Sequence, residues 1–164
     1  MTESWHSDDQ DLILRRAVPN GYSVVAISRA QSDIIIGGKA MDGDVRGGGV
    51  AIMHRDCWKS SRIKPQHKCT SFEVVCARVN VKPTSVVVCN IYRSQPITDK
   101  FFDEFRRLLE QLVTFRCPLV IVGDLNVHLE KADCTHTKRF NRLLKSFGLL
   151  IPLTIRGDSG CFYY

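Results

Sequence analysis

Two polar side chains suited to hydrolytic chemistry, Asp124 and Asn126, follow the apolar run from Leu119 to Val122. The run predicts a buried strand, so both side chains emerge where a rigid element ends. A carboxylate can orient or deprotonate a water molecule, and a carboxamide can donate to a phosphate oxygen. The same residues could form an ordinary Asx turn, which is common at strand ends. The pattern therefore indicates a candidate hydrolytic site and leaves the turn open.

Two other segments could supply groups to the same site. Tyr92 and Arg93 end another apolar strand with a phenol and a guanidinium, and Glu3 precedes the first predicted helix. Each has a plainer interpretation. Tyr92 could be a half-buried strand aromatic, Arg93 a surface charge, and Glu3 a solvated residue near the N-terminus.

The elements that must position these residues can be predicted from hydrophobic periodicity. The strands Phe72 to Val81 and Ser85 to Tyr92, joined by the turn Lys82 to Thr84, predict an antiparallel hairpin. Thr98 is a plausible N-cap for a helix from Asp99 to Phe115. The inward face of this helix is predicted to hold Phe101, Phe105, Leu108 and Leu112, widened by Phe102, Leu109 and Val113.

The remaining predicted elements complete a mixed order of helices and strands. They are a helix from Asp8 to Val18, strands at Tyr22 to Ser28, Ile34 to Ile36 and Val50 to His54, and a helix from Thr137 to Phe147. Antiparallel pairs combined with a helix crossover predict an α/β sandwich built on a mixed sheet.

Composition narrows the classes of protein to consider. The 164 residues fit one domain, no apolar stretch is long enough to cross a membrane, and the N-terminal segment has no signal-peptide pattern. A net charge of +6 suits a polyanionic partner. The seven cysteines are odd in number and none are at CxxC spacing, which argues against disulfides or structural zinc and favours a reducing intracellular compartment. Cys76 and Cys89 are predicted to be small core residues.

Several segments match a known family in order along the chain. They are Thr2-Glu3-Ser4-Trp5-His6, Gly21-Tyr22 followed by Arg29, Arg46-Gly47-Gly48-Gly49-Val50-Ala51-Ile52, Ser71-Phe72-Glu73, Asn90-Ile91-Tyr92-Arg93, Phe102-Asp103-Glu104-Phe105, and Val120 to His128. Together they resemble the endonuclease/exonuclease/phosphatase superfamily and, within it, the endonuclease domains of non-LTR retrotransposons.

The resemblance implies a phosphodiesterase on a two-sheet α/β sandwich, dependent on Mg²⁺ or Mn²⁺, that nicks double-stranded DNA in the nucleus or cytoplasm. It implies that Glu3 is a metal ligand and that Asp124 orients or deprotonates the attacking water. Asn126 would donate to a phosphate oxygen, and the Tyr92 hydroxyl would contact the phosphate. Tyr92, Arg93 and Asn126 would contact the nucleic acid.

The sequence departs from the family pattern at both ends. The family begins with strands that carry an Asn of the metal and phosphate site, whereas here Met1 directly precedes Thr2. The family ends in a Ser-Asp-His segment that does not occur in this sequence. We therefore expect a single incomplete domain, residues 1–164, with little or no nuclease activity, because one acid–base group typically contributes about 10²–10⁴-fold.

Two alternatives stay open. One is a catalytically dead remnant that binds DNA or another partner. The other is a phosphatase that acts on a small or lipid phosphoester.

Overall fold

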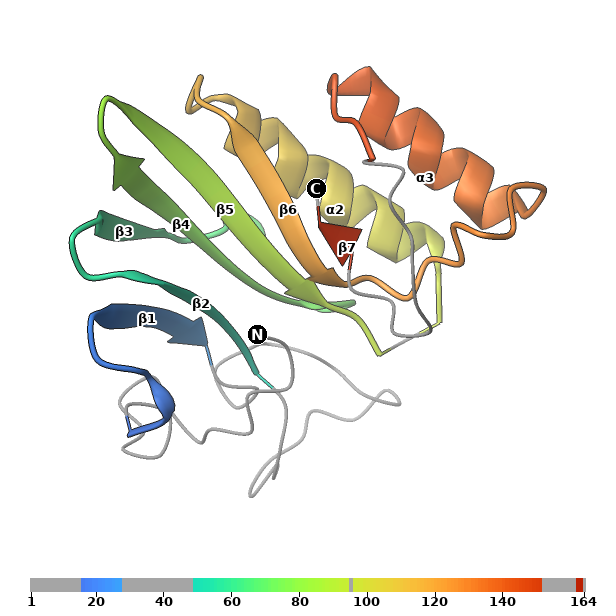
Figure 1. Ribbon diagram of the computed structural model, residues 1–164. Coiled ribbons are helices and arrows are strands. Elements are labelled where there is room, and N and C mark those ends of the chain that lie inside the picture. The colour runs from blue at the N-terminus through green and yellow to red at the C-terminus, as the bar shows by residue number, and fades with distance from the viewer. Residues whose placement is uncertain (1–15, 28–48, 95, 152–161, 164) are drawn as a thin grey trace.

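The computed structural model describes residues 16–27, 49–94, 96–151 and 162–163. Within these ranges a small sheet and a pair of helices lie on opposite sides of a larger sheet (Figure 1). In chain order the elements are β1 (Tyr22–Ile27), β2 (Val50–Arg55), β3 (Lys59–Ile63), β4 (Glu73–Val81), β5 (Thr84–Tyr92), α2 (Asp99–Val113), β6 (Leu119–Asp124), α3 (Thr135–Ser146) and β7 (Phe162–Tyr163).

The larger sheet has the strand order β3-β4-β5-β6-β7, and β1 pairs with β2 in the smaller one. β4 and β5 form an antiparallel hairpin, whereas β5 and β6 run parallel. The parallel pair follows from α2, which carries the chain back along the sheet between the two strands. As a result β5 and β6 end at the same edge of the sheet.

The main core lies between the larger sheet and the helices. Alternate residues of β5, Val87, Cys89 and Ile91, face this layer and are fully buried. The other side of the core is a cluster of aromatic rings from both helices. Phe105 of α2 stacks on Phe101 and on Phe140 of α3, with ring centroids 5.7 Å apart in both pairs. These contacts fix the helices against the sheet.

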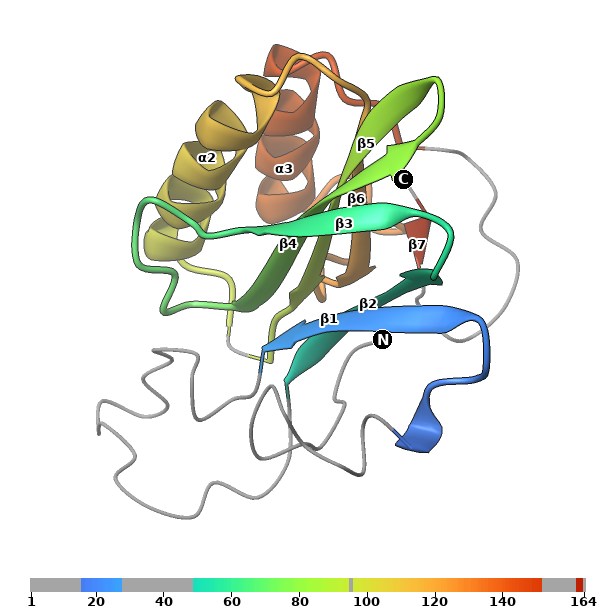
Figure 2. The same ribbon diagram turned by 90° about the vertical axis from the view of Figure 1, so that its left-hand side faces the viewer.

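A second core lies between the two sheets (Figure 2). Val50 and Ile52 of β2 pack against Val75 and Val79 of β4. A polar bond crosses the same space, because the Asn90 side-chain amide donates to the Ala51 carbonyl at 2.9 Å. Asn90 is fully buried, so this bond links the sheets in the absence of competing water.

The predicted two-sheet α/β sandwich is confirmed. The hairpin and the helix from Asp99 are present, and Thr98 caps that helix by accepting from Phe101 N at 3.4 Å. Cys76 and Cys89 are buried, as expected. Val113 was wrongly placed on the inward face of the helix, since it is 41% exposed at the last turn.

Two strands, β3 and β7, were missed, and two predicted elements cannot be compared. β3 is polar over Lys59 to Arg62 because it is an edge strand, and edge strands commonly carry charge. The predicted strand Ile34 to Ile36 and nearly all of the predicted helix Asp8 to Val18 lie outside the described residues. In the part of the chain that is described, no helix is long and apolar enough to cross a membrane.

Candidate active site

Three side chains that can bind or move protons lie in one row across the larger sheet. Glu73, the first residue of β4, pairs with Tyr92, the last residue of β5. Tyr92 pairs in turn with Asp124, the last residue of β6. Neighbouring strands are about 4.8 Å apart, so the row spans roughly 10 Å. Its register brings together residues that are far apart in the sequence.

The row faces the space between the sheets. Tyr92 packs against the inter-sheet core, and Glu73 shares its side of β4 with Val75 and Val79 of that core. In β6, Ile121 faces the helices, so alternation places Asp124 on the opposite side, with Tyr92. Tyr92 and Asp124 are both half-buried, which leaves them accessible at the sheet edge.

Asp124 and Asn126 form a tight turn at the end of β6. The Asn126 backbone N–H donates to Asp124 Oδ1 at 3.0 Å, and Asn126 adopts a left-handed backbone with φ of 50°. Asn tolerates this conformation better than most residues. The Asx turn considered from the sequence is therefore present. It also places the exposed Asn126 beside the Asp124 carboxylate.

Gly123 allows β6 to approach β5 closely just before Asp124. Its φ is +116°, and a Cβ at this position would lie 2.0 Å from the Ile91 carbonyl oxygen and 2.5 Å from Asn90 Oδ1. No side chain fits at such distances. Glycine is thus required for the register that pairs Tyr92 with Asp124.

Arg93 lies beneath the Asp124–Asn126 turn and is not the surface charge considered from the sequence, because it is only 2% exposed. Its Nε donates to the Leu125 carbonyl and its Nη2 to the Asn126 carbonyl, both at 2.7 Å. The guanidinium also lies over the Phe101 ring, 5.1 Å from the centroid. Burial lowers the pKa of Arg93, and the negative charge of Asp124 opposes that shift. Arg93 supports the turn from inside the protein.

The backbone of Arg93 in turn fixes the Asn126 side chain. Its Nδ2 donates to the Arg93 carbonyl at 2.5 Å. Nδ2 carries a second N–H, and neither that hydrogen nor Oδ1 bonds to any of the described residues. These atoms are oriented and remain open to a ligand.

Glu73 is the member of the row that sequence reasoning missed as a site residue. It is 2% exposed, and its Oε2 accepts from Gly49 N at 2.6 Å, at the entry to β2. The sequence feature that could have identified Glu73 is the hairpin. When its turn is placed so that Val81 pairs with Thr84, the register sets Glu73 opposite Tyr92.

Comparison with known proteins identifies the family. A model of the Endonuclease/Exonuclease/phosphatase family matches residues 1–163. The chain belongs to this family. No curated protein matches the sequence.

Three solved structures are similar to the chain, and the first, with a TM-score above 0.5, supports the fold alone. The endonuclease domain of TRAS1, a telomere-specific non-LTR retrotransposon, is similar with a TM-score of 0.55 and 13% identity over 86% of this chain and 58% of that one. The human nocturnin catalytic domain has a TM-score of 0.47 and 16% identity, over 78% of this chain and 49% of that one. TDP2 from Caenorhabditis elegans has a TM-score of 0.46 and 14% identity, over 79% of this chain and 37% of that one. The chain thus spans little more than half of the TRAS1 structure.

Endonuclease/exonuclease/phosphatase family members generally depend on a divalent metal ion. The end of β6 offers the Asp124 carboxylate, and Asn126 adds an amide oxygen beside it. Oxygen donors of this kind suit Mg²⁺, which usually keeps several waters and takes only one or two protein carboxylates. The described residues contain no group of three or more His, Cys, Asp or Glu side chains that could hold a metal, and Glu3 lies outside them. The donors fit the chemistry without forming a complete protein cage.

Proposed function

We propose that this protein is a divalent-metal-dependent phosphodiesterase that nicks double-stranded DNA. The observation that carries the proposal is the pairing of Tyr92 with Asp124 at the ends of parallel strands, with Asn126 turned to the same edge. Family membership supports phosphoester chemistry, and the net charge of +6 supports a polyanionic substrate. The similarity to a retrotransposon endonuclease domain favours DNA among the possible substrates.

Each residue has a role that matches its position. The Asp124 carboxylate orients a water molecule for attack on phosphorus and accepts its proton. The Tyr92 hydroxyl and the second amide N–H of Asn126 donate to phosphate oxygens and so contact the nucleic acid. Arg93 acts through Asn126 and is a positioning residue, because its guanidinium is committed to the carbonyls beneath the turn.

Glu3 is proposed as a metal ligand on the family resemblance, and the Asp124 carboxylate at the end of β6 is proposed to assist. A bound divalent cation would stabilise the negative charge that develops at the phosphorus centre and the leaving oxygen. Glu73 is buried against Gly49 N, so we assign it to holding β2 against the row.

A second candidate is DNA binding without cleavage. It is favoured by the basic composition. A phosphatase acting on a small phosphoester would use the same row, and no described feature selects it over DNA.

The test is the conversion of supercoiled plasmid to open circles by the purified protein in Mg²⁺. We expect weak nicking that stops with a chelator and falls at least about 10²-fold in Asp124→Ala. The matched control is Asp133→Ala, because Asp133 is an exposed loop carboxylate whose partner is Lys138 at 3.3 Å. Salt-sensitive DNA binding with no nicking would favour the second candidate. Equal nicking by both variants would refute the assignment of Asp124.

A further inference from the structure

A cluster of basic side chains lies on the edge strand β3 and on the loop that joins it to β4. Residues 57–72 contain four Lys or Arg residues and no Asp or Glu. Three of these cations and a histidine line one cavity of about 420 Å³, and no acidic residue is among the described residues that line it. The four basic residues are all exposed, and we call them the basic loop: Arg62, Lys64, His67 and Lys68.

The apolar residues beneath the basic loop are covered. Ile63 and Phe72 line the same cavity but are only 8% and 1% exposed, because they pack in the core between the larger sheet and the helices. A ligand at this surface therefore meets the basic side chains and not an apolar floor. Exposed cations with no carboxylate among them attract a polyanion and steer its approach.

Polar side chains of α2 hold the backbone of this loop, which lies beside the helix (Figure 2). The Gln111 side chain accepts from Gln66 N at 2.8 Å and donates to the Lys64 carbonyl at 2.9 Å. Glu104 accepts from the backbone and hydroxyl groups of residues 70–71 at 2.6–2.9 Å. The Lys64 ammonium group forms no ion pair or hydrogen bond with the described residues. A loop fixed in this way loses little conformational entropy when its side chains bind a ligand.

The basic loop continues the row of proposed site residues along the same edge of the sheet. β3 is the neighbour of β4, and the loop leads into Glu73, the first residue of the row. Three strand spacings separate β3 from β6. At about 4.8 Å each, they place the loop roughly 15 Å from Asp124. Duplex DNA rises about 3.4 Å per base pair, so this distance corresponds to about four base pairs.

We propose that the basic loop binds backbone phosphates of duplex DNA about four base pairs from the phosphodiester that Asp124 addresses. The inference rests on the proposed function, from which it takes its ligand. Lys64 and Lys68 would contact phosphates as point charges. Contacts of this kind fix the register of the duplex on the protein without reading its sequence.

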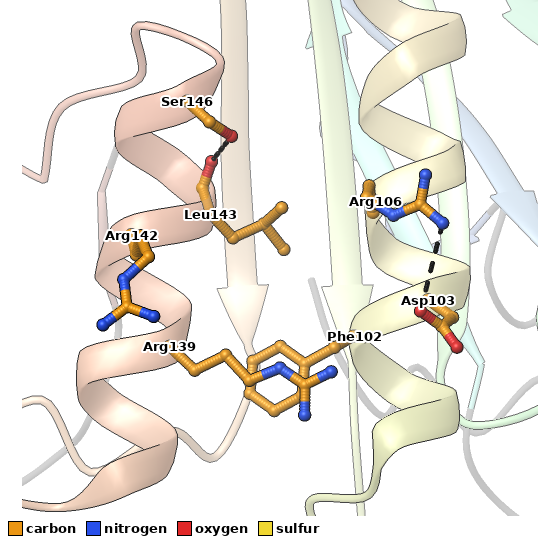
Figure 3. Close-up of a pocket in the computed structure, with 7 residues that line it drawn as sticks. All are labelled: Phe102, Asp103, Arg106, Arg139, Arg142, Leu143 and Ser146. Carbon is orange, nitrogen blue, oxygen red and sulfur yellow. Dashed lines mark hydrogen bonds and ion pairs between the residues drawn. The ribbon is translucent and has the colours of Figure 1, made fainter.

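The arginines between α2 and α3 are less suited to successive phosphates. Arg106 pairs with Glu110 at 2.7 Å and with Asp103 at 4.0 Å, and Arg139 pairs with Asp99. Figure 3 shows Arg106 beside Asp103. These carboxylates neutralise the guanidinium groups and repel a polyanion. The cavity lined by the basic loop has no such carboxylate among its described lining residues.

Fluorescence anisotropy of labelled duplex DNA at several salt concentrations, with a chelator to prevent cleavage, tests the inference on the full chain. In Lys64→Gln/Lys68→Gln the slope of log Kd against log salt concentration should fall by about two, because the slope scales with the number of phosphates neutralised. Affinity at low salt should fall at least about tenfold.

The matched control is Lys82→Gln/Lys145→Gln. It removes the same charge from exposed positions in the β4–β5 turn and on α3, outside the cavity. Its slope should change by less than about 0.5, because neither lysine belongs to the proposed surface. Circular dichroism checks that each variant is folded.

Two results would overturn the inference. One is a slope in Lys64→Gln/Lys68→Gln that equals that of wild type or of the control variant. The other is binding of a poly-glutamate peptide that weakens as much as DNA binding does, which would show a surface for any anion. Plasmid nicking in Mg²⁺ is measured separately. A smaller slope without nicking by wild type supports the basic loop and refutes the nuclease, whereas nicking with an unchanged slope supports the nuclease and refutes the basic loop.

Discussion

Arg93 and Asn126 hold each other in place across the ends of β5 and β6. The Asn126 side-chain amide donates to the Arg93 carbonyl at 2.5 Å, and the Arg93 guanidinium donates back to the Asn126 carbonyl at 2.7 Å. The Arg93 backbone N–H also donates to the Asp124 carbonyl at 2.9 Å. The turn that carries both proposed catalytic groups is therefore fixed from beneath by one buried cation. A site held in this way keeps its geometry before a substrate arrives.

Arg93→Met should destabilise the protein by about 2–4 kcal/mol, because two buried carbonyls lose charged donors. Urea denaturation measures this loss. Under conditions where the variant is folded, the nicking rate should fall while DNA affinity changes little, since the guanidinium faces the protein interior. Arg107→Met, an exposed change on α2, is the control. A smaller salt dependence of DNA binding in folded Arg93→Met would instead make Arg93 a direct phosphate contact.

Gly123→Ala should cost clearly more stability than Gly148→Ala. Both glycines have positive φ, so each substitution carries roughly 1–2 kcal/mol of backbone strain. A Cβ at Gly148 has nothing within 4 Å, whereas one at Gly123 would lie 2.0 Å from the Ile91 carbonyl oxygen. The difference in unfolding free energy between the two variants isolates the close approach of β6 to β5. Equal losses would mean that this approach is not required.

Glu104 should make stability depend on acid pH. Burial raises the pKa of this carboxyl, but hydrogen bonds from Ser71 and Thr70 outweigh that effect and hold the pKa below its ordinary value. The backbone N–H and hydroxyl of both residues donate to it at 2.6–2.9 Å. Because the pKa is lower in the folded state, the stabilisation is complete above the unfolded pKa of about 4.3. It is lost as the pH falls through the lower folded value.

The measurement is urea denaturation of wild type and Glu104→Gln as a function of pH. At neutral pH the variant should be less stable by about 1–3 kcal/mol, because an amide cannot replace four bonds to a carboxylate. The difference in unfolding free energy between wild type and Glu104→Gln should shrink below about pH 4. Glu110→Gln, an exposed position on the same helix, serves as the control. A difference in unfolding free energy that does not change with pH would contradict the role given to the Glu104 charge.

The β4–β5 hairpin shows which parts of the site can be predicted from the sequence. Both strands are evident from their apolar runs, and so is the turn between them. The sequence pattern placed a three-residue turn over Lys82 to Thr84, whereas Thr84 already pairs with Val81 in the structure. A shift of one residue would set Glu73 opposite Arg93 instead of Tyr92 and reverse the face of every pair. The two strands could therefore be predicted from the sequence, whereas the alignment of Glu73, Tyr92 and Asp124 across the sheet could not.

The burial of Arg93 illustrates a second limit. Local sequence shows an arginine after a strand, and such residues are usually exposed. Its burial depends on Phe101 from α2 and on two carbonyls from the turn after β6, which no local pattern contains. Asp124 and Asn126, in contrast, lie in one short segment, so their proximity followed directly from the sequence.

The central claim is that Tyr92 and Asp124, paired across β5 and β6, act together on one phosphodiester. The most direct test is the rate of Mg²⁺-dependent plasmid nicking by wild type, Tyr92→Phe, Asp124→Asn and the double variant. We expect each single change to slow nicking by about 10²-fold or more, and the double variant to be little slower than Asp124→Asn, because groups acting as a unit are not additive. Nicking that survives Asp124→Asn at the wild-type rate, in protein of unchanged stability, would contradict the account.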